Sequence, residues 1–253
     1  EMAFCDWSSD VCSSDLRSSA NKDDVDWRNK DGKNWLTSVK DQDGIGNCWA
    51  YAYCGTIESR YKIEQRDAGK NLDLSEIWLY SADKFPLPNG LSIAPYQTTK
   101  EWALMGNGIV DEACMPGEKY PFGEAIAKAQ CADWQARGTK ATPQFVSPDL
   151  GPSTATTEYM MKVLDQRGPF VGKILAAFRI GDDGVFECEK DSSSSVNHGV
   201  IVVGYNKKDR YWIIKNSWGT TWGDNGYGKL RFDNCNITLY APDEFIGIRP
   251  PVR

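Results

Sequence analysis

The sequence is poor in several features that mark common classes of binding protein. It contains one histidine, and none of its eight cysteines form a CxxC pair, which argues against a zinc site of the usual spacings. It carries no basic excess: the net charge is −6, so nucleic acid is not expected as the main partner. Its longest apolar runs, such as FVGKILAAF and GVIVVGY, are too short to span a bilayer. We therefore expect no metal, no cofactor and no membrane partner.

The first twenty residues lack the basic start and the apolar core of a signal peptide. Their string SSDVCSSDL resembles a translated sequencing-adapter read of the kind found in assembled environmental DNA. A Ser/Asp-rich disordered leader is the alternative. On either interpretation we expect residues 1–20, which include Cys5 and Cys12, to have no functional role, and we expect the functional domain to span residues 21–253.

The other cysteines are scattered through an acidic, tryptophan-rich chain. This pattern is typical of a few disulfides plus one or two free thiols, and disulfides persist in oxidising compartments. The sequence therefore favours a secreted, periplasmic or lysosome-like location.

Helical patterns come before strand-like patterns along the chain. Apolar spacing and capping residues predict four helices, at 47–69, at 75–83 with Ser75 as cap, at 98–108 and at 154–168. β-rich runs follow at 170–178, 199–205, 211–218 and 226–232. This order indicates an α+β protein with a helical N-terminal lobe at about 40–130 and a β-rich lobe at about 131–235, with the terminal segments crossing over.

Cys48 stands at the start of the first predicted helix, in DQDGIGNCWAYA. A cysteine attacks as its thiolate, which is favoured by a helix N-terminus and by a neighbouring imidazolium. Taken alone, Cys48 would more often be a small core residue than a nucleophile. The only imidazole is His198, at the start of an apolar run, and Asn216 of KNSWG follows it in the order of a Cys-His-Asn triad.

Acyl transfer also needs hydrogen-bond donors aimed at the developing oxyanion. The backbone N–H of Cys48 is one candidate, and the side-chain amide of Gln42, six residues upstream, is the second. Trp218, two residues after Asn216, would shield the His198–Asn216 hydrogen bond from water. Structural alternatives exist for each residue taken alone, and it is their combination in one order that favours catalysis.

Five motifs resemble those of the papain-like cysteine peptidases, over about residues 25–236: DWR (26–28), Q-x5-C-W-A (42–50), LSE (74–76), NHGVIVVGY (197–205) and YWIIKNSWGTTWGDNGYG (211–228). The resemblance implies a two-lobe fold with the active cleft between the lobes. It also implies hydrolysis of peptide bonds through a thioester acyl-enzyme. It assigns Gln42 to the oxyanion hole, Cys48 as nucleophile, His198 as acid and base, and Asn216 as the orienting residue.

The same resemblance suggests which residues meet the substrate and which molecules bind. The candidate substrate-binding residues are Gly46, Asn47, Trp49, Asn197, Trp218 and Trp222, with Trp222 on the primed side. Asn89-Gly90 is the candidate for the glycine-rich segment that bonds the substrate backbone. The expected partners are peptide or protein substrates, with a propeptide or a protein inhibitor as further candidates.

The chain departs from the family pattern in its helical lobe. Ile45 replaces a disulfide cysteine, Asn47 replaces the serine before the nucleophile, and the cysteine expected near Ala82 is absent. The two customary disulfides of that lobe therefore cannot form, so we expect packing by its tryptophans and tyrosines to hold it together.

Other cysteines match different disulfides of the family. Cys188 and Cys235 match the bridge of the C-terminal lobe, and the region of Cys114 and Cys131 resembles that of dipeptidyl-peptidase-type cathepsins, where an extra bridge occurs. Cys54, within the first helix, is expected to be a buried free thiol.

We expect an endopeptidase. The absence of a second histidine excludes the histidine-bearing occluding loop of carboxydipeptidase relatives, whereas an aminopeptidase with another blocking element stays open. The departures at Asp43, Ile45 and Asn47 motivate a second alternative, a catalytically impaired homologue that binds peptides. A Cys-His acyltransferase or transglutaminase-like enzyme is a third, although its third member is usually acidic.

Overall fold

The computed structural model describes residues 22–43, 46–82, 108–117, 131–144, 156–188, 196–239 and 242–251. Several predictions fall outside these stretches: the leader at 1–20, Ile45, the Asn89-Gly90 segment and nearly all of the helix at 98–108.

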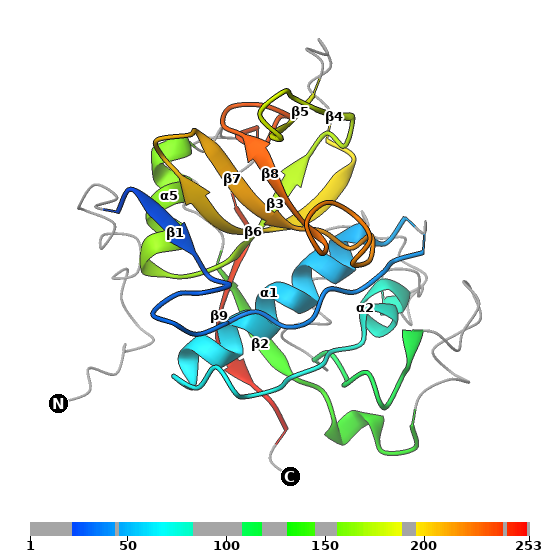
Figure 1. Cartoon of the computed structure of the whole chain (residues 1–253). Coiled ribbons are helices and arrows are strands. Elements are labelled where there is room, and N and C mark those ends of the chain that lie inside the picture. Colours follow the sequence, from blue (N-terminus) through cyan, green and yellow to red (C-terminus); the bar gives the residue numbers. More distant parts are fainter. Residues whose placement is uncertain are drawn as a thin grey trace, which may run out of the picture.

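Three predicted helices are confirmed within the described residues (Figure 1). They are α1 (Cys48–Glu64), α2 (Glu76–Ala82) and α5 (Thr157–Gln166), and a short 3-10 turn, η3 (Trp134–Ala136), was not predicted. Helix α1 is buried on most sides, including all residues from Ala52 to Ser59. A helix that is covered all round belongs to the centre of a protein. It crosses the middle of the molecule, with the sheet on one side and α2 on the other.

The other two helices begin at the hydroxyl caps that their sequences contain. The Trp78 N–H donates to Ser75 Oγ at 3.1 Å, so Ser75 caps α2 as predicted. The Tyr159 N–H donates to the Thr156 side chain, also at 3.1 Å. Such caps satisfy N–H groups that lack a partner in the first helical turn. Helix α5 then ends just before Gly168-Pro169, the predicted stop.

Seven of the nine strands found among the described residues form one sheet in the order β1-β6-β7-β8-β5-β4, with β3 also paired to β6. The strands of this sheet are β1 (Asp24–Asp26), β3 (Phe170–Ile174), β4 (Phe178–Ile180), β5 (Phe186–Cys188), β6 (His198–Asn206), β7 (Tyr211–Lys215) and β8 (Tyr227–Arg231). The β-rich runs predicted between residues 170 and 232 are therefore confirmed as strands.

Strand β6 is the centre of this sheet and opens with the only histidine. It pairs with β3 beside His198, with β1 at its far end and with β7 along its other side. It is buried from His198 to Tyr205 because both α1 and α5 pack against it. Gly204 must lack a side chain, since an added Cβ would lie 2.3 Å from the Val25 carbonyl oxygen.

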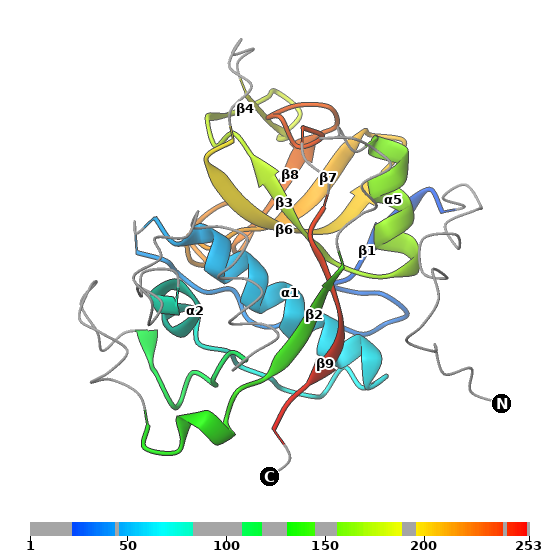
Figure 2. The ribbon, with the colours of Figure 1, turned by 180° about the vertical axis from the view of Figure 1, so that it is seen from behind.

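Strands β2 (Lys140–Gln144) and β9 (Glu244–Arg249) form a separate antiparallel ribbon beside α1, which Figure 2 shows from behind. Residues 131–139, just before this ribbon, are tied to residues 109–114 by the Cys114–Cys131 disulfide and the Ile109–Thr139 bridge. The division of the chain into lobes near residue 131 stays a prediction.

Both disulfides suggested by the resemblance are present, Cys114–Cys131 and Cys188–Cys235. Cys54 is a fully buried free thiol. Aromatic packing supports the helical part, where the rings of Trp78 and Trp134 lie 5.0 Å apart. Among the described residues, we find no helix with the length and apolar character needed to traverse a bilayer.

Candidate active site

The thiol of Cys48 lies at the junction between α1 and the sheet. Cys48 is the first residue of α1 and is partly exposed. Its Sγ accepts a hydrogen bond from the Gly199 N–H at 3.4 Å, although Gly199 is 151 positions away in the chain. Because Gly199 directly follows His198 at the start of β6, the fold brings the thiol to the imidazole-bearing end of this strand.

The imidazole of His198 is oriented by Asn216, the residue after β7. His198 Nε2 lies 2.8 Å from Asn216 Oδ1. The same oxygen accepts the Ser217 N–H, also at 2.8 Å, which identifies it as the acceptor end of the amide. The imidazole must therefore carry a proton on Nε2, which leaves Nδ1 as the second nitrogen for proton transfer.

The environment of His198 is largely apolar. The residue is 7% exposed, and burial lowers its pKa, while the hydrogen bond to Asn216 acts in the opposite direction. The Trp218 ring lies over it, with 4.7 Å between the ring centroids, and Asn216 is buried. The Trp218 ring therefore covers the imidazole, and its role in shielding the His198–Asn216 hydrogen bond from water stays a prediction.

Gln42 is held beside the same segment by two hydrogen bonds to Ser217. Its backbone N–H donates to the Ser217 carbonyl at 2.8 Å, and its side-chain Oε1 accepts the Ser217 hydroxyl at 2.6 Å. The second bond fixes which way the amide faces, with Nε2 as its donor end. The sequence did not reveal this function of Ser217, because a serine in an NSW motif carries no sign of its partner.

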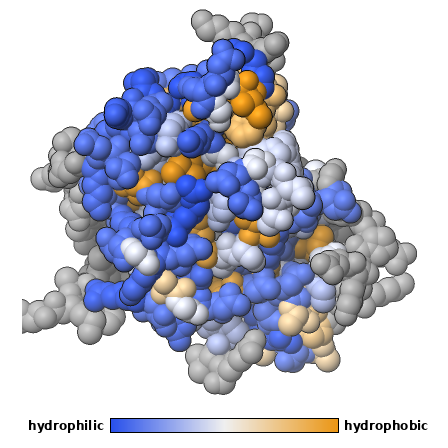
Figure 3. All heavy atoms as spheres, viewed as in Figure 1, coloured by the Kyte–Doolittle hydropathy of each residue, from blue (hydrophilic) through white to orange (hydrophobic). Residues whose placement is uncertain are grey.

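Aromatic rings continue from Trp218 along the sheet. The Trp222 ring stacks on Phe186 at 5.0 Å and meets Trp218 edge-on at 5.7 Å, and Phe178 contacts both tryptophans. The face of β4 that carries Phe178 also carries Ile180, which is 65% exposed. Figure 3 shows an apolar patch over β4 and β5.

The other candidate substrate-binding residues are distributed differently. Gly46 is exposed, and Trp49 is half-buried with its ring edge-on to Tyr53. Asn197 is exposed, and its Oδ1 accepts the Ala176 N–H at 2.7 Å. Asn47 is fully buried and has no surface to offer a substrate. Its predicted contact with substrate is therefore corrected: it is a core residue before the start of α1.

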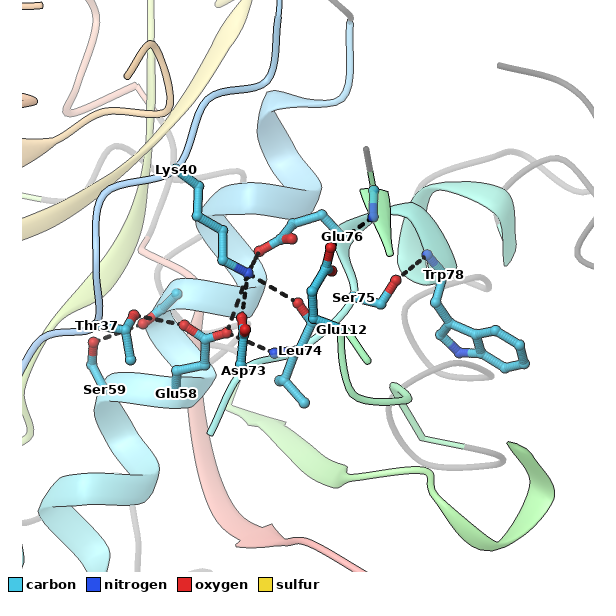
Figure 4. Close-up of polar contacts among 12 residues, drawn as sticks. Thr37, Lys40, Glu58, Ser59, Asp73, Leu74, Ser75, Glu76, Trp78 and Glu112 are labelled. Carbon is cyan, nitrogen blue, oxygen red and sulfur yellow. Dashed lines mark hydrogen bonds and ion pairs between the residues drawn. The ribbon is translucent and has the colours of Figure 1, made fainter. Parts of the chain in front are cut away.

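Behind the site lies a cluster of buried and partly buried charged residues that sequence analysis missed. Lys40, Glu58 and Glu76 meet there, and Figure 4 shows them with their neighbours. Lys215, the residue before Asn216, lies close to the same cluster and lines a cavity with Glu58 that has room for about one water molecule. Charged residues are ordinarily exposed, so a sequence gives no signal that these are buried.

The chain also matches a known protein family over most of its length. Residues 21–242 match the family described as "Papain family cysteine protease". The chain belongs to this papain family of cysteine proteases. The family assignment confirms the resemblance inferred from the sequence motifs.

Individual papain-family relatives match most of the chain. It is 29% identical to "Digestive cysteine proteinase 2" of Homarus americanus over 229 residues, which cover 86% of this chain and 65% of the relative. It is 32% identical to "Cathepsin L2" of Homo sapiens over 236 residues, which cover 86% of this chain and 64% of the relative. The chain thus spans just under two thirds of the length of these relatives.

Solved papain-family structures share the fold. The chain matches digestive procathepsin L 3 from the larval midgut of Tenebrio molitor with a TM-score of 0.60 at 23% identity, covering 93% of this chain and 75% of the other. It matches the proform of the Amb a 11 cysteine protease, a ragweed pollen allergen, with a TM-score of 0.62 at 26% identity, covering 94% and 68%. The predicted α+β papain-like fold is confirmed.

Proposed function

We propose that this chain is a cysteine peptidase that cleaves peptide bonds within peptides or proteins, with Cys48 as nucleophile. The observation that carries the proposal is the position of the Cys48 thiol, 3.4 Å from the N–H of the residue after His198, whose ring is bonded to Asn216. A nucleophile, a base and a residue that orients the base are the parts that covalent acyl transfer requires.

The geometry supports a two-step reaction. The Cys48 thiolate adds to the substrate carbonyl, and His198 then donates a proton to the departing amine, which leaves a thioester. Water, deprotonated by His198, hydrolyses the thioester and restores the thiol. The Cys48 N–H at the helix start and Nε2 of Gln42 stabilise the negative oxygen of each tetrahedral intermediate.

The proposal is tested with a fluorogenic peptide and a thiol-directed epoxide. We expect hydrolysis of the peptide, its loss after epoxide treatment, and an adduct on Cys48 by mass spectrometry. Peptides with a blocked N-terminus should be cleaved as well as free ones, because an endopeptidase does not need the terminal amine. Failure to cleave any peptide, with no adduct on Cys48, would instead indicate an impaired peptide-binding homologue.

Location and partners are part of the same proposal. The two disulfides favour an oxidising compartment, which can be extracellular, periplasmic or lysosome-like. Several of the matched structures contain procathepsins or a proform, so we propose that a propeptide binds this domain before activation. Inhibition by an added propeptide of a papain-family relative would test this.

Replacing Gln42 with alanine is expected to lower kcat by about 100- to 1000-fold with little change in KM, the usual cost of losing one oxyanion donor. The matched control is Gln166→Ala, which makes the same change at an exposed position of α5. Steady-state kinetics on both variants separate the loss of the proposed donor from the effect of a glutamine-to-alanine change in general. Equal activity of Gln42→Ala and wild type would show that Gln42 is not an oxyanion donor.

Replacing Gly199 with alanine tests how closely α1 must approach β6. The added Cβ would lie 3.2 Å from Trp49 Cα and 3.4 Å from Trp49 N, so it would push the backbone beside Cys48. We expect kcat to fall by about 10-fold or more, because small displacements of reacting groups are costly. Gly69→Ala, in an exposed turn, is the control and should keep full activity. An unaffected kcat in Gly199→Ala would show that this approach can relax.

A further inference from the structure

Lys215 is a buried lysine next to residues of the candidate active site. It is the last residue of β7, directly before Asn216 and Ser217, and it is 5% exposed. Its Nζ donates to the Thr37 carbonyl at 2.9 Å and lies 3.3 Å from the Thr37 hydroxyl oxygen. The lysine thus joins the end of β7 to the N-terminal segment, residues 35–42, which leads to Gln42.

Thr37 continues this connection to the helix that carries the thiol. Its hydroxyl donates to Glu58 Oε2 at 2.6 Å, and Glu58 lies on α1. The other carboxylate oxygen of Glu58 accepts the Leu74 N–H at 2.9 Å, so the carboxylate is held on both sides (Figure 4). A continuous chain of hydrogen bonds therefore runs from β7 through Thr37 to α1.

The N-terminal segment is anchored in the same cluster a second time. Lys40, two residues before Gln42, has its Nζ 2.8 Å from both Asp73 Oδ1 and Glu76 Oε1, and it lies 3.8 Å from Glu58 Oε1. The segments that present Gln42, Cys48 and Asn216 consequently meet in one polar cluster behind the site, with Glu58, Glu76 and Lys215 buried in it.

Burial of the Lys215 ammonium has a free-energy cost. Among the described residues no carboxylate lies within ion-pair distance of its ammonium, and burial lowers the pKa of Lys215 to about 8, an effect that Glu58 opposes. A buried charge without an ion-pair partner is costly for a fold. The hydrogen bonds from the Lys215 Nζ to Thr37 offset part of that cost, and they join two segments that carry residues of the site.

We propose that Lys215 is a positioning residue that fixes the end of β7, and with it Asn216 and His198, relative to the Cys48-bearing helix α1 through Thr37 and Glu58. The inference rests on the proposed peptidase function. Lys215 makes no contact with substrate in this proposal. It affects catalysis by positioning Asn216, which orients the His198 imidazole.

The test replaces Lys215 with methionine, which keeps the length of the side chain and removes its donors. We expect kcat to fall by about 10- to 100-fold while KM changes less than about twofold, because misplacement of reacting groups affects the chemical step. The rate of Cys48 alkylation by iodoacetamide, which involves no substrate, should fall together with kcat.

Lys62→Met is the matched control. Lys62 lies on α1, is buried, and donates to the Leu36 carbonyl at 2.8 Å, one residue before Thr37. The variant removes an ammonium that also bonds to the N-terminal segment but makes no contact with β7. Its kcat and its alkylation rate should stay within about twofold of wild type, even where its melting temperature falls.

Thr37→Val provides a second, independent variant. It removes the hydroxyl link to Glu58 and should lower kcat and the alkylation rate in the same sense as Lys215→Met. The two changes should be less than additive in combination, since they interrupt one chain of contacts. If Lys215→Met does not fold, as judged by circular dichroism, Thr37→Val decides the question.

The outcomes separate this inference from the proposed function. Equal loss of kcat in Lys215→Met and Lys62→Met, or an unchanged kcat in Lys215→Met or in Thr37→Val, overturns the positioning role. A wild-type protein that neither cleaves peptides nor reacts with iodoacetamide at Cys48 overturns the proposed function instead.

Discussion

Replacing Cys48 with alanine is expected to lower kcat by about 10⁵- to 10⁶-fold, the scale on which loss of a catalytic nucleophile acts in a triad. The physical reason is that no other described thiol can take its place: Cys54 is fully buried, and the remaining described cysteines are in disulfides. Burial also raises the pKa of Cys54, with Glu76 and Glu58 acting in the same direction, so its reactive thiolate is disfavoured.

The measurement is hydrolysis of a fluorogenic peptide by purified wild type and variant. Cys54→Ala is the matched control, because it makes the same change in the same helix, six positions further on. It should retain activity, with at most a modest loss of stability from the small change in core volume. A Cys48→Ala variant with more than about one thousandth of wild-type activity would place the nucleophile elsewhere.

Replacing His198 with alanine is expected to lower kcat by about 10⁴-fold or more, because proton transfer to the leaving amine and from water would both be lost. The chain has no second histidine that could substitute. Alkylation of Cys48 by iodoacetamide at neutral pH should slow as well, because the thiol would lose the imidazole that can take up its proton.

Asn216→Ala completes this comparison. It keeps the imidazole but removes the oxygen that accepts a hydrogen bond from Nε2, so the ring would lose its orientation. Its loss of kcat should lie between wild type and His198→Ala. An Asn216→Ala variant as inactive as His198→Ala, with alkylation of Cys48 unchanged in both, would contradict the assigned roles.

Helices and strands were predictable where the sequence contained both a capping or stop residue and a regular spacing of apolar residues. Helix α2 has a hydroxyl cap at Ser75, and α5 ends before Gly168-Pro169, so their boundaries followed from backbone hydrogen-bond requirements. Strand β6 was readable from the uninterrupted apolar run GVIVVGY, which suits a strand covered on both faces.

The ribbon of β2 and β9 was not predicted. Strand β2 contains Pro143, which weakens the signal for a strand, and the proline is tolerated because a two-stranded ribbon has open edges. Asn47 was misjudged for a related reason: asparagine is usually exposed, and only packing around the start of α1 buries it.

The amino-acid order alone supplied the residues of the proposed active site: a cysteine at a helix start, one histidine, and an asparagine and a glutamine in a fixed order. It could do so because reactive groups are properties of side chains, and helix starts are decided by neighbouring residues. Only the tertiary structure packed α1 against β6, oriented the Gln42 side chain through Ser217, and brought the partly buried Lys40 close to the buried Glu58 and Lys215. These contacts join residues far apart in the chain, and they depend on the packing of the whole core, which no local pattern encodes.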